Sequence, residues 1–342
     1  MLASALHLLG HVLISTTFAF TMITNEEFSL SFRSRLNAVS VSSHVLEKAT
    51  IKVRCQCGNN AFAVEVERSS PVVRCHCVRC RKFHTSAFAS YLKVSRDAIP
   101  CDSTSAPVQK YLDSCNEIGP VERLSCGWCN SVLASVPAIE TGGPLGGGAL
   151  LALGCVEDAS IPPGLAKEWA HKFEEWKKEE SAKWWEAAPS GRPIRGCRAE
   201  RTLRGGCACG ACTFEAWSGS EFQTQHCYCN LCRRLSGSVA QTWIPVYKDG
   251  FRWTKEDKLR VVRTTKHGQR HMCTGCGGVM TIVYDDQPYT VWPCAGAIED
   301  DSMPKAEDMS RSLCRAIHIC CSMMQPWYEL PEDGLPRLKY AG

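Results

Sequence analysis

The sequence predicts a mainly β protein built from two tandem copies of one cysteine-rich domain, with one helical segment near the end of the first copy. Two observations lead to this fold class. A pattern of closely spaced cysteines occurs twice along the 342 residues. The segments between these cysteines are short, partly alternate between apolar and polar residues, and are separated by glycine and proline, which is typical of β strands.

The cysteine pattern repeats at a nearly fixed distance along the chain. Five pairs lie 152 positions apart: Cys55/Cys207, Cys57/Cys209, Cys75/Cys227, Cys77/Cys229 and Cys80/Cys232. A later C-x-x-C recurs 147 positions on, as Cys126/Cys273 and Cys129/Cys276. Self-similarity of this kind indicates a duplicated domain. We place the first copy at 47–198 and the second at 199–342, and we leave 1–46 outside the fold as a targeting or disordered segment.

Several short stretches of the sequence have the pattern of β strands, and one longer stretch has the pattern of a helix. The stretches AFAVEV (61–66), AFASYLKV (87–94), AQTWIPVYK (240–248) and GGVMTIVYD (277–285) are strand-sized and rich in β-branched and aromatic residues. Only 164–187 has a helical pattern, in which Trp169, Phe173, Trp176 and Trp184 form one apolar stripe among Lys and Glu. We interpret that stripe as a face packed against the domain.

Composition and charge exclude several classes of protein. The chain has 23 cysteines, an odd number, and it is far longer than the small secreted domains that depend on disulfides. A metal-binding protein of a reducing intracellular compartment is therefore expected. The formal charge of +4 and the absence of long basic runs argue against a nucleic-acid partner.

The first 46 residues combine an apolar stretch with a Ser-rich, acid-poor stretch that contains Arg33 and Arg35. This pattern favours a cleaved targeting segment, while a membrane anchor or a disordered tail stays open. We expect a plastid or mitochondrial location if the segment targets the protein, and the cytoplasm otherwise, with no membrane association after processing.

Seven cysteines per copy suit two zinc ions of different kinds. A structural zinc has four protein ligands, whereas a catalytic zinc has three and keeps one position open. The three thiols of C-x-C-x-x-C lie on one tight turn, so we pair the first C-x-C with the distant C-x-x-C as a closed site and leave the triad open. Disulfides would leave an odd thiol in each copy, and a thioredoxin-type pair needs a βαβ setting that is missing. The other nine cysteines, Cys320 among them, are interpreted as incidental.

The sequence resembles a known family at this point. The motifs are C-x-C-G, C-H-C-x-x-C-R-[RK] and C-x-x-C, followed in the second copy by H-I, P-W-x-x-L and D-G-L-P-R. They resemble the glutathione-dependent formaldehyde-activating enzyme family, which includes centromere protein V. The resemblance implies an Mss4-like β fold in each copy and two Zn²⁺ ions per domain, four per chain. It implies structural zinc on Cys55, Cys57, Cys126 and Cys129, and on Cys207, Cys209, Cys273 and Cys276. It implies catalytic zinc on Cys75, Cys77 and Cys80, and on Cys227, Cys229 and Cys232.

The resemblance also implies a carbon–sulfur lyase that forms or cleaves S-hydroxymethylglutathione from glutathione and formaldehyde. Arg81, Lys82, Arg233 and Arg234 follow the triads, and we expect them to hold glutathione's carboxylates, although a solvent-exposed turn is an equal alternative. A non-catalytic zinc-binding interaction or chromatin-associated module stays open as a second function. The second copy keeps the fuller closing signature, with His318, Pro326 and Trp327, so we expect it to contribute more of the turnover.

Overall fold

The structure, a computed structural model, is mainly β, and strands are its most common regular element. It describes residues 48–100, 107–115, 119–138, 146–171, 173–177, 202–217, 224–302 and 316–340. The mainly β prediction is confirmed. The predicted targeting segment 1–46 lies outside the described residues. Among the described residues, no helix combines the length and the apolar character that crossing a bilayer requires.

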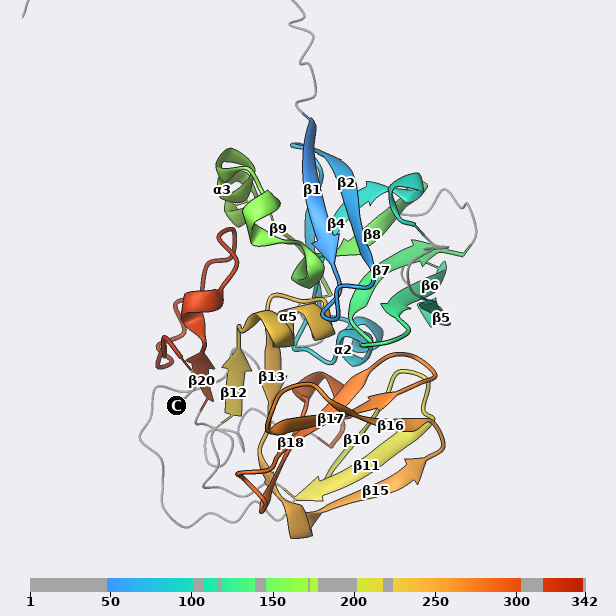
Figure 1. Cartoon of the computed structure of the whole chain (residues 1–342), viewed down its shortest axis with the longest axis vertical. Helices are drawn as coiled ribbons and strands as arrows, with labels where there is room; N and C mark the ends of the chain where they lie inside the picture. Colours follow the sequence, from blue (N-terminus) through green and yellow to red (C-terminus); the bar gives the residue numbers. More distant parts are fainter. Residues whose placement is uncertain are drawn as a thin grey trace, which may run out of the picture. The chain divides into compact units, whose positions relative to one another are not determined.

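The first copy contains a hairpin and one large sheet (Figure 1). The hairpin pairs β1 (Lys48–Arg54) with β2 (Ala61–Glu67) in antiparallel register. The large sheet has the order β5-β6-β7-β8-β4-β3-β9. Its strands are β3 (Val72–Cys75), β4 (Ala89–Ser95), β5 (Val108–Cys115), β6 (Gly119–Cys126), β7 (Val132–Pro137), β8 (Gly148–Ala152) and β9 (Phe173–Trp176). The helices are α2 (Val78–His84) and α3 (Pro163–His171), with 3₁₀ turns η1 (Arg96–Ala98), η2 (Leu153–Cys155) and η3 (Asp158–Ser160).

The second copy distributes equivalent strands over three sheets. They are β10 (Thr202–Gly206), β11 (Cys212–Trp217) and β15 (Phe251–Glu256); β13 (Gln241–Trp243), β12 (Thr224–Cys227) and β20 (Ala316–Ile319); and β14 (Val246–Tyr247), β19 (Thr290–Pro293), β18 (Val279–Tyr284), β17 (Gly268–Cys273) and β16 (Leu259–Arg263). Helix α5 is Asn230–Ser236, and the 3₁₀ turns are η4 (Lys248–Gly250), η5 (Ala295–Ala297) and η6 (Cys321–Met323).

One proline explains why the sheets of the two copies differ. Strand β4 runs without a break through Lys93, whose amide donates to the Pro71 carbonyl at 3.0 Å. The position equivalent to Lys93 in the second copy is Pro245, which has no amide hydrogen to donate. The corresponding strand therefore stops after Trp243 and resumes at Val246, and the large sheet separates into two smaller ones.

The predicted helix over 164–187 is wrong beyond His171. Helix α3 ends there, and Phe173–Trp176 forms strand β9, which pairs in parallel with β3. The free edge of β3 offers backbone partners that outweigh a weak helical preference. Arg74 secures the pairing, because its guanidinium lies 3.8 Å from the centre of the Phe173 ring and 3.2 Å from Glu175. Trp184 and the rest of the expected helix lie outside the described residues.

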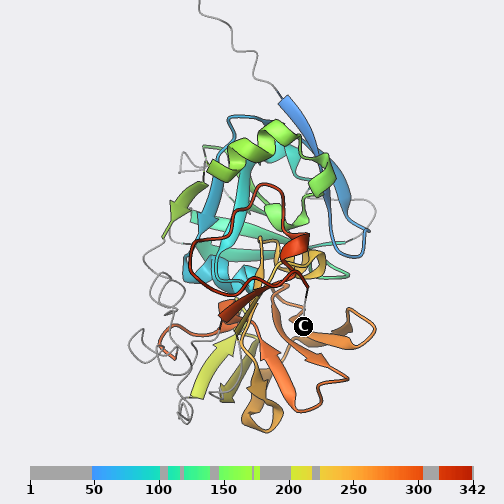
Figure 2. The same cartoon turned by 90° about the vertical axis from the view of Figure 1, so that its left-hand side faces the viewer.

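The two copies share their hydrophobic cores. Residues 46–342 form one compact unit. The core of the first copy includes Tyr228, Trp327 and Tyr328 from the second, and the core of the second includes Phe83 from the first. Trp327 is fully buried, and its ring lies 6.1 Å from that of Trp169 in α3. The C-terminal segment, red in Figure 1 and Figure 2, accordingly lies beside α3.

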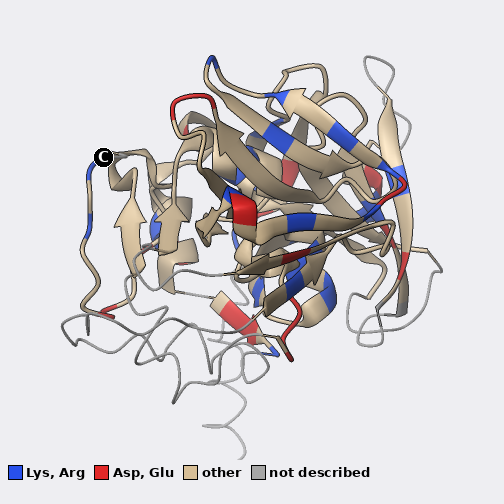
Figure 3. Cartoon of the chain, turned by 90° about the horizontal axis from the view of Figure 1, so that it is seen from below, with Lys and Arg blue, Asp and Glu red and all other residues tan. Residues whose placement is uncertain are grey.

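Along the backbone drawn in Figure 3, Lys and Arg (blue) lie among Asp and Glu (red). Several of these neighbours form ion pairs, such as Arg252 with Glu215 and Arg263 with Asp285. The expectation of no nucleic-acid partner stays a prediction.

Candidate metal centres

The first closed site joins two turns that are far apart in sequence. Cys55 and Cys57 lie in the turn after β1, whereas Cys126 ends β6 and Cys129 lies in the turn before β7. Their four sulfurs are within 4.8 Å of one another. The Cys57 sulfur is 3.4 Å from that of Cys55 and 3.7 Å from that of Cys126. Four thiolates around zinc at about 2.3 Å would be separated by about 3.8 Å. The spacing therefore fits a tetrahedral zinc.

The second closed site repeats this geometry. Cys207, Cys209, Cys273 and Cys276 again lie within 4.8 Å of one another. The Cys209 sulfur is 3.5 Å from Cys207 and 3.6 Å from Cys273. Cys212, which follows nearby, is fully buried and stays outside the group.

Each triad surrounds the start of a short helix. Cys75 ends β3, Cys77 is the N-cap of α2, and Cys80 lies in the first turn of that helix. The Cys77 sulfur accepts a hydrogen bond from the Cys80 amide at 3.4 Å and lies 3.6 Å from the Cys75 sulfur. The three sulfurs are within 4.8 Å of one another. A thiolate is favoured beside helix amide groups, so this turn suits metal binding.

The second triad has the same arrangement. Cys227 ends β12, Cys229 is the N-cap of α5, and its sulfur accepts from the Cys232 amide at 3.4 Å. All the described cysteines in both copies are free thiols. Four clusters of unpaired, close sulfur atoms are a donor set that zinc prefers, so the residues present fit this metal.

A buried arginine contacts each triad, and sequence reasoning missed both. The Arg123 guanidinium donates to the Cys80 sulfur at 3.5 Å, and Arg270 donates to Cys232 at 3.6 Å. Both side chains are fully buried. Hydrogen bonds with Cys75 and Cys77, together with the charge of Arg123, hold the pKa of Cys80 well below its ordinary value. These arginines offset the negative charge of three thiolates.

A signal for these arginines was present in the sequence. Arg123 and Arg270 are 147 positions apart, the same offset as the C-x-x-C motifs that each precedes by three residues. Residues three apart on a strand point to opposite faces. On β6 and β17 the arginine therefore faces the triad, and the cysteine three residues later faces the closed site. R-x-x-C-x-x-C is therefore the fuller motif.

The surroundings of the two arginines differ. Arg123 is held by Asp113, with its Nε 3.1 Å from the carboxylate, and by the Tyr91 hydroxyl at 3.0 Å. Tyr91 in turn donates to Cys80 at 3.5 Å and lies 2.8 Å from His84. In the second copy Trp243 takes the place of Tyr91, and its ring lies 5.6 Å from the Arg270 guanidinium. Within the described residues no carboxylate pairs with Arg270.

Strands β9 and β20 return along the first strand of each triad, pairing in parallel with β3 and β12. These returning strands bring polar groups to the residue between the first two cysteines of each triad. His76 lies 2.8 Å from Glu175, and the equivalent Tyr228 lies 3.0 Å from His318. His318 Nε2 is 3.0 Å from Asp333. Burial lowers the pKa of His318 although Asp333 opposes that shift, so the imidazole is expected to be neutral. Where the second copy has Tyr228 in place of His76, its paired strand has His318 in place of Glu175, so the two differences match.

Three of the four basic residues that follow the triads form ion pairs between the copies. Arg81 is 2.6 Å from Asp300, and Lys82 pairs with the neighbouring Glu299. Arg233 forms two hydrogen bonds with Asp158, at 2.8 and 3.2 Å. Arg234 is half-buried, and no carboxylate pairs with it in the described part of the chain. Their predicted contact with glutathione stays a prediction, and the solvent-exposed turn is wrong for the buried Arg81 and Arg233.

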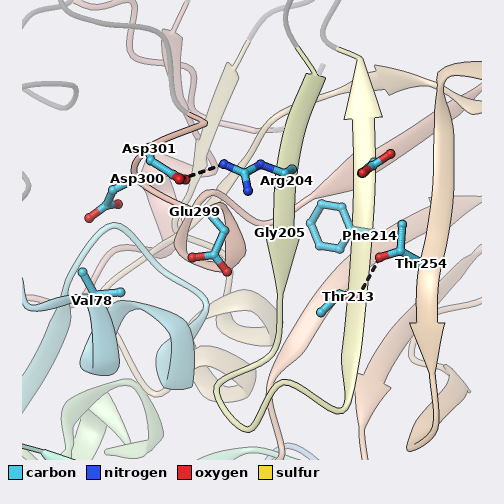
Figure 4. A pocket seen from close by; sticks show the side chains of 10 residues that line it. Val78, Arg204, Gly205, Thr213, Phe214, Thr254, Glu299, Asp300 and Asp301 are labelled. Carbon is cyan, nitrogen blue, oxygen red and sulfur yellow. Dashed lines mark hydrogen bonds and ion pairs between the residues drawn. The ribbon is translucent and has the colours of Figure 1, made fainter.

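A cavity of 490 Å³ lies between the start of α2 and residues of the second copy (Figure 4). Val78, which follows Cys77, lines it together with Arg204 and four carboxylates. Those acidic residues are Glu215, Glu299, Asp300 and Asp301. Each of the four is already ion-paired, and the lining Arg204 is held by Asp301, so these lining residues offer no free cation to the carboxylates of glutathione.

These features define a class: a duplicated β protein with two closed four-thiol sites and two three-thiol sites. A sequence model of the family described as glutathione-dependent formaldehyde-activating enzyme matches residues 50–179 and again 202–321. The chain belongs to this family, and the predicted membership is confirmed.

Two individual proteins are similar to parts of the chain. One, from Halomonas elongata, is provisionally named a glutathione-dependent formaldehyde-activating enzyme. It is 25% identical over 134 residues, which cover 37% of this chain and 80% of that protein. The crystal structure of a Rhodobacter sphaeroides protein covers 32% of this chain and 97% of its own, at 17% identity and a TM-score of 0.26.

Proposed function

We propose that the protein is a zinc-dependent carbon–sulfur lyase that acts on glutathione adducts of small aldehydes, S-hydroxymethylglutathione above all. The observation that carries the proposal is the cluster of Cys75, Cys77 and Cys80, three thiols with a buried arginine beside them. Three ligands leave a position for a substrate. Family membership supplies the chemical class of the substrates.

We assign four zinc ions to the chain, one at each thiol cluster. When bound at a triad, zinc supplies a Lewis acid that lowers the pKa of a substrate thiol and polarises a carbonyl group. The two closed sites have no position left for a substrate, and their role is to stabilise the fold. The two triads are the candidate reaction sites.

The side chains around the first triad prepare it for a thiolate. Arg123 supplies a fixed positive charge that needs no rearrangement, because Asp113 and Tyr91 hold its guanidinium in place. Burial raises the pKa of Tyr91 well above its ordinary value, so its hydroxyl keeps its proton and can donate to sulfur. The glutathione sulfur then bonds to the aldehyde carbon while the carbonyl oxygen takes up a proton, and cleavage is the reverse.

Exchange spectroscopy on glutathione and formaldehyde tests this proposal. Zinc-loaded, reduced protein should accelerate their interconversion with S-hydroxymethylglutathione over the rate in buffer. The double variant Cys77→Ser, Cys229→Ser should return the rate to that of buffer, and Cys321→Ser, outside every cluster, should not. If wild-type protein gives no acceleration, the proposed lyase activity is rejected and the non-catalytic zinc-binding module is favoured.

A further inference from the structure

The residue that follows each returning strand occupies the same place in both copies. Trp176 ends β9 opposite Cys75, and Ile319 ends β20 opposite Cys227. The carbonyls of these two residues accept from the amides of His76 and Tyr228, at 2.8 and 3.1 Å. The next residues are Lys177 and Cys320. Both have left-handed backbones, with φ of 55° and 59°.

This turn presents different side chains to the two triads. Lys177 is exposed to solvent, whereas Cys320 is buried. The Cys320 sulfur lies 4.0 Å from that of Cys227 and also interacts with Cys229. A left-handed backbone is unfavourable for residues other than glycine, so the surrounding structure must hold the backbone of Cys320 in this conformation. The second triad thus has a fourth thiol beside it.

The spacing around Cys320 is close to that of a metal ligand. Its 4.0 Å separation from Cys227 is near the distance of about 3.8 Å between thiolates on one zinc. The three triad sulfurs are within 4.8 Å of one another, and Cys320 does not join them at that spacing. Coordination therefore needs the Cys320 sulfur to move closer to the triad than it lies here. Arg270 approaches Cys232 itself, so the Cys227–Cys229 side is where Cys320 adds a ligand.

We propose that Cys320 is the fourth ligand of the metal at the second triad, so that this site is closed by the protein while the first remains open. The inference rests on the proposed zinc occupancy. On binding, the Cys320 thiol releases its proton to solvent and its sulfur forms one bond to zinc. A substrate thiol must displace Cys320 from the second site, whereas at the first site the equivalent Lys177 carries no thiol.

This assignment reverses the sequence-based expectation that the second copy contributes more of the turnover. The full closing signature of the second copy brings in His318 and Trp327, but the same segment also brings Cys320 to the triad. The first copy then carries most of the open-site chemistry. The second copy contributes when Cys320 leaves the metal.

Zinc release to a coloured chelator, from reduced full-length protein, tests the assignment directly. Wild-type protein should lose one zinc per chain quickly, from the first triad, and Cys77→Ser should remove that fast phase. In Cys320→Ser the second triad should join the fast phase, so that two zinc ions leave quickly. Loss of the fourth ligand should speed that release by about tenfold or more. The matched control Cys321→Ser should behave as wild type.

A second measurement keeps the proposal falsifiable if Cys320→Ser does not fold. In wild-type protein, alkylation of Cys320 should begin only as Cys227, Cys229 and Cys232 lose their metal. Two fast zinc ions in wild type with no change in Cys320→Ser would overturn the proposal, and so would alkylation of Cys320 at a rate independent of metal. Neither readout uses turnover, so inactive protein that still shows the predicted release would reject only the proposed enzyme.

Discussion

Arg81 of the first copy and Asp300 of the second form an ion pair of 2.6 Å, and Arg233 and Asp158 repeat it in the opposite direction at 2.8 Å. Each arginine follows a triad and is buried. The acids lie just after η5 and η2, which pack on α2 and α5 respectively. The duplication therefore works like a symmetric dimer within one chain, in which each copy supports the helix of the other's triad.

Other residues that repeat along the sequence fit this relationship. Ser86 donates to the Ala240 carbonyl at 2.6 Å, and Ser238 donates to the Phe88 carbonyl at 2.7 Å. A Cβ at Gly154 would lie 2.2 Å from the Arg233 carbonyl oxygen, so the close contact between the copies there requires glycine. The serines that the sequence repeats serve this contact.

We expect Asp300→Ala to lower the free energy of unfolding by about 1–3 kcal/mol, because it leaves the buried Arg81 guanidinium without its carboxylate. Urea unfolding followed by circular dichroism measures the loss. The adjacent Asp301→Ala is a matched control: its pair with Arg204 is exposed on both sides, so the change should be less than about 1 kcal/mol. Equal losses of unfolding free energy in the two variants would mean that the buried pair stabilises the fold no more than the exposed one.

We expect Cys126→Ala or Cys273→Ala to lower the melting temperature of the whole described fold. Structural zinc supplies folding free energy. Because Trp327 and Tyr228 of the second copy lie in the core of the first, one closed site should affect both copies together. Scanning calorimetry with zinc analysis should show a single lowered transition, whereas Cys77→Ser should largely spare it. Two separate transitions would show that the copies melt independently.

The sequence predicted the duplication and the division of the thiols, because each ligand position leaves a local signature in cysteine spacing. It could not predict how the copies pack. Asp158 and Asp300 look like ordinary surface acids, and their role arises only when each meets an arginine of the other copy. Cys320 has no cysteine counterpart in the first copy, so its place at a triad depends on the pairing of β20 with β12. The helix predicted over 164–187 was wrong beyond His171, because the periodic pattern of the sequence does not reveal that β3 has a free edge for Phe173–Trp176 to pair with.

We expect Arg270→Met to weaken zinc at the second triad by about 10–100-fold. The guanidinium donates to Cys232, and its positive charge favours the thiolate form that binds metal. Zinc should also leave this site at a higher pH than in wild type, which competition with a chelator across a pH series would measure. Arg252→Met, at an exposed position of β15, should change neither. Unchanged zinc affinity in Arg270→Met would show that the charge of Arg270 does not support metal binding at the second triad.

His84 is fully buried in the first copy. Burial lowers its pKa to about 3, so it stays neutral in the folded protein at pH values where an unfolded chain, with a histidine pKa of about 6.5, takes up a proton. Its contribution to stability is present above about pH 6.5 and falls as the pH drops toward 3. The slope in that window approaches about 1.4 kcal/mol per pH unit.

We therefore expect wild-type protein to lose about 1 kcal/mol more than His84→Gln between pH 6.5 and 5.5, since glutamine can still donate to the Tyr91 hydroxyl but does not titrate. Urea unfolding of the zinc-loaded proteins at both pH values measures the difference. The exposed His267→Gln should follow wild type. Parallel losses in wild type and His84→Gln would mean that His84 takes up its proton within the fold, and the neutral His84–Tyr91 pair beside Cys80 would then have to be abandoned.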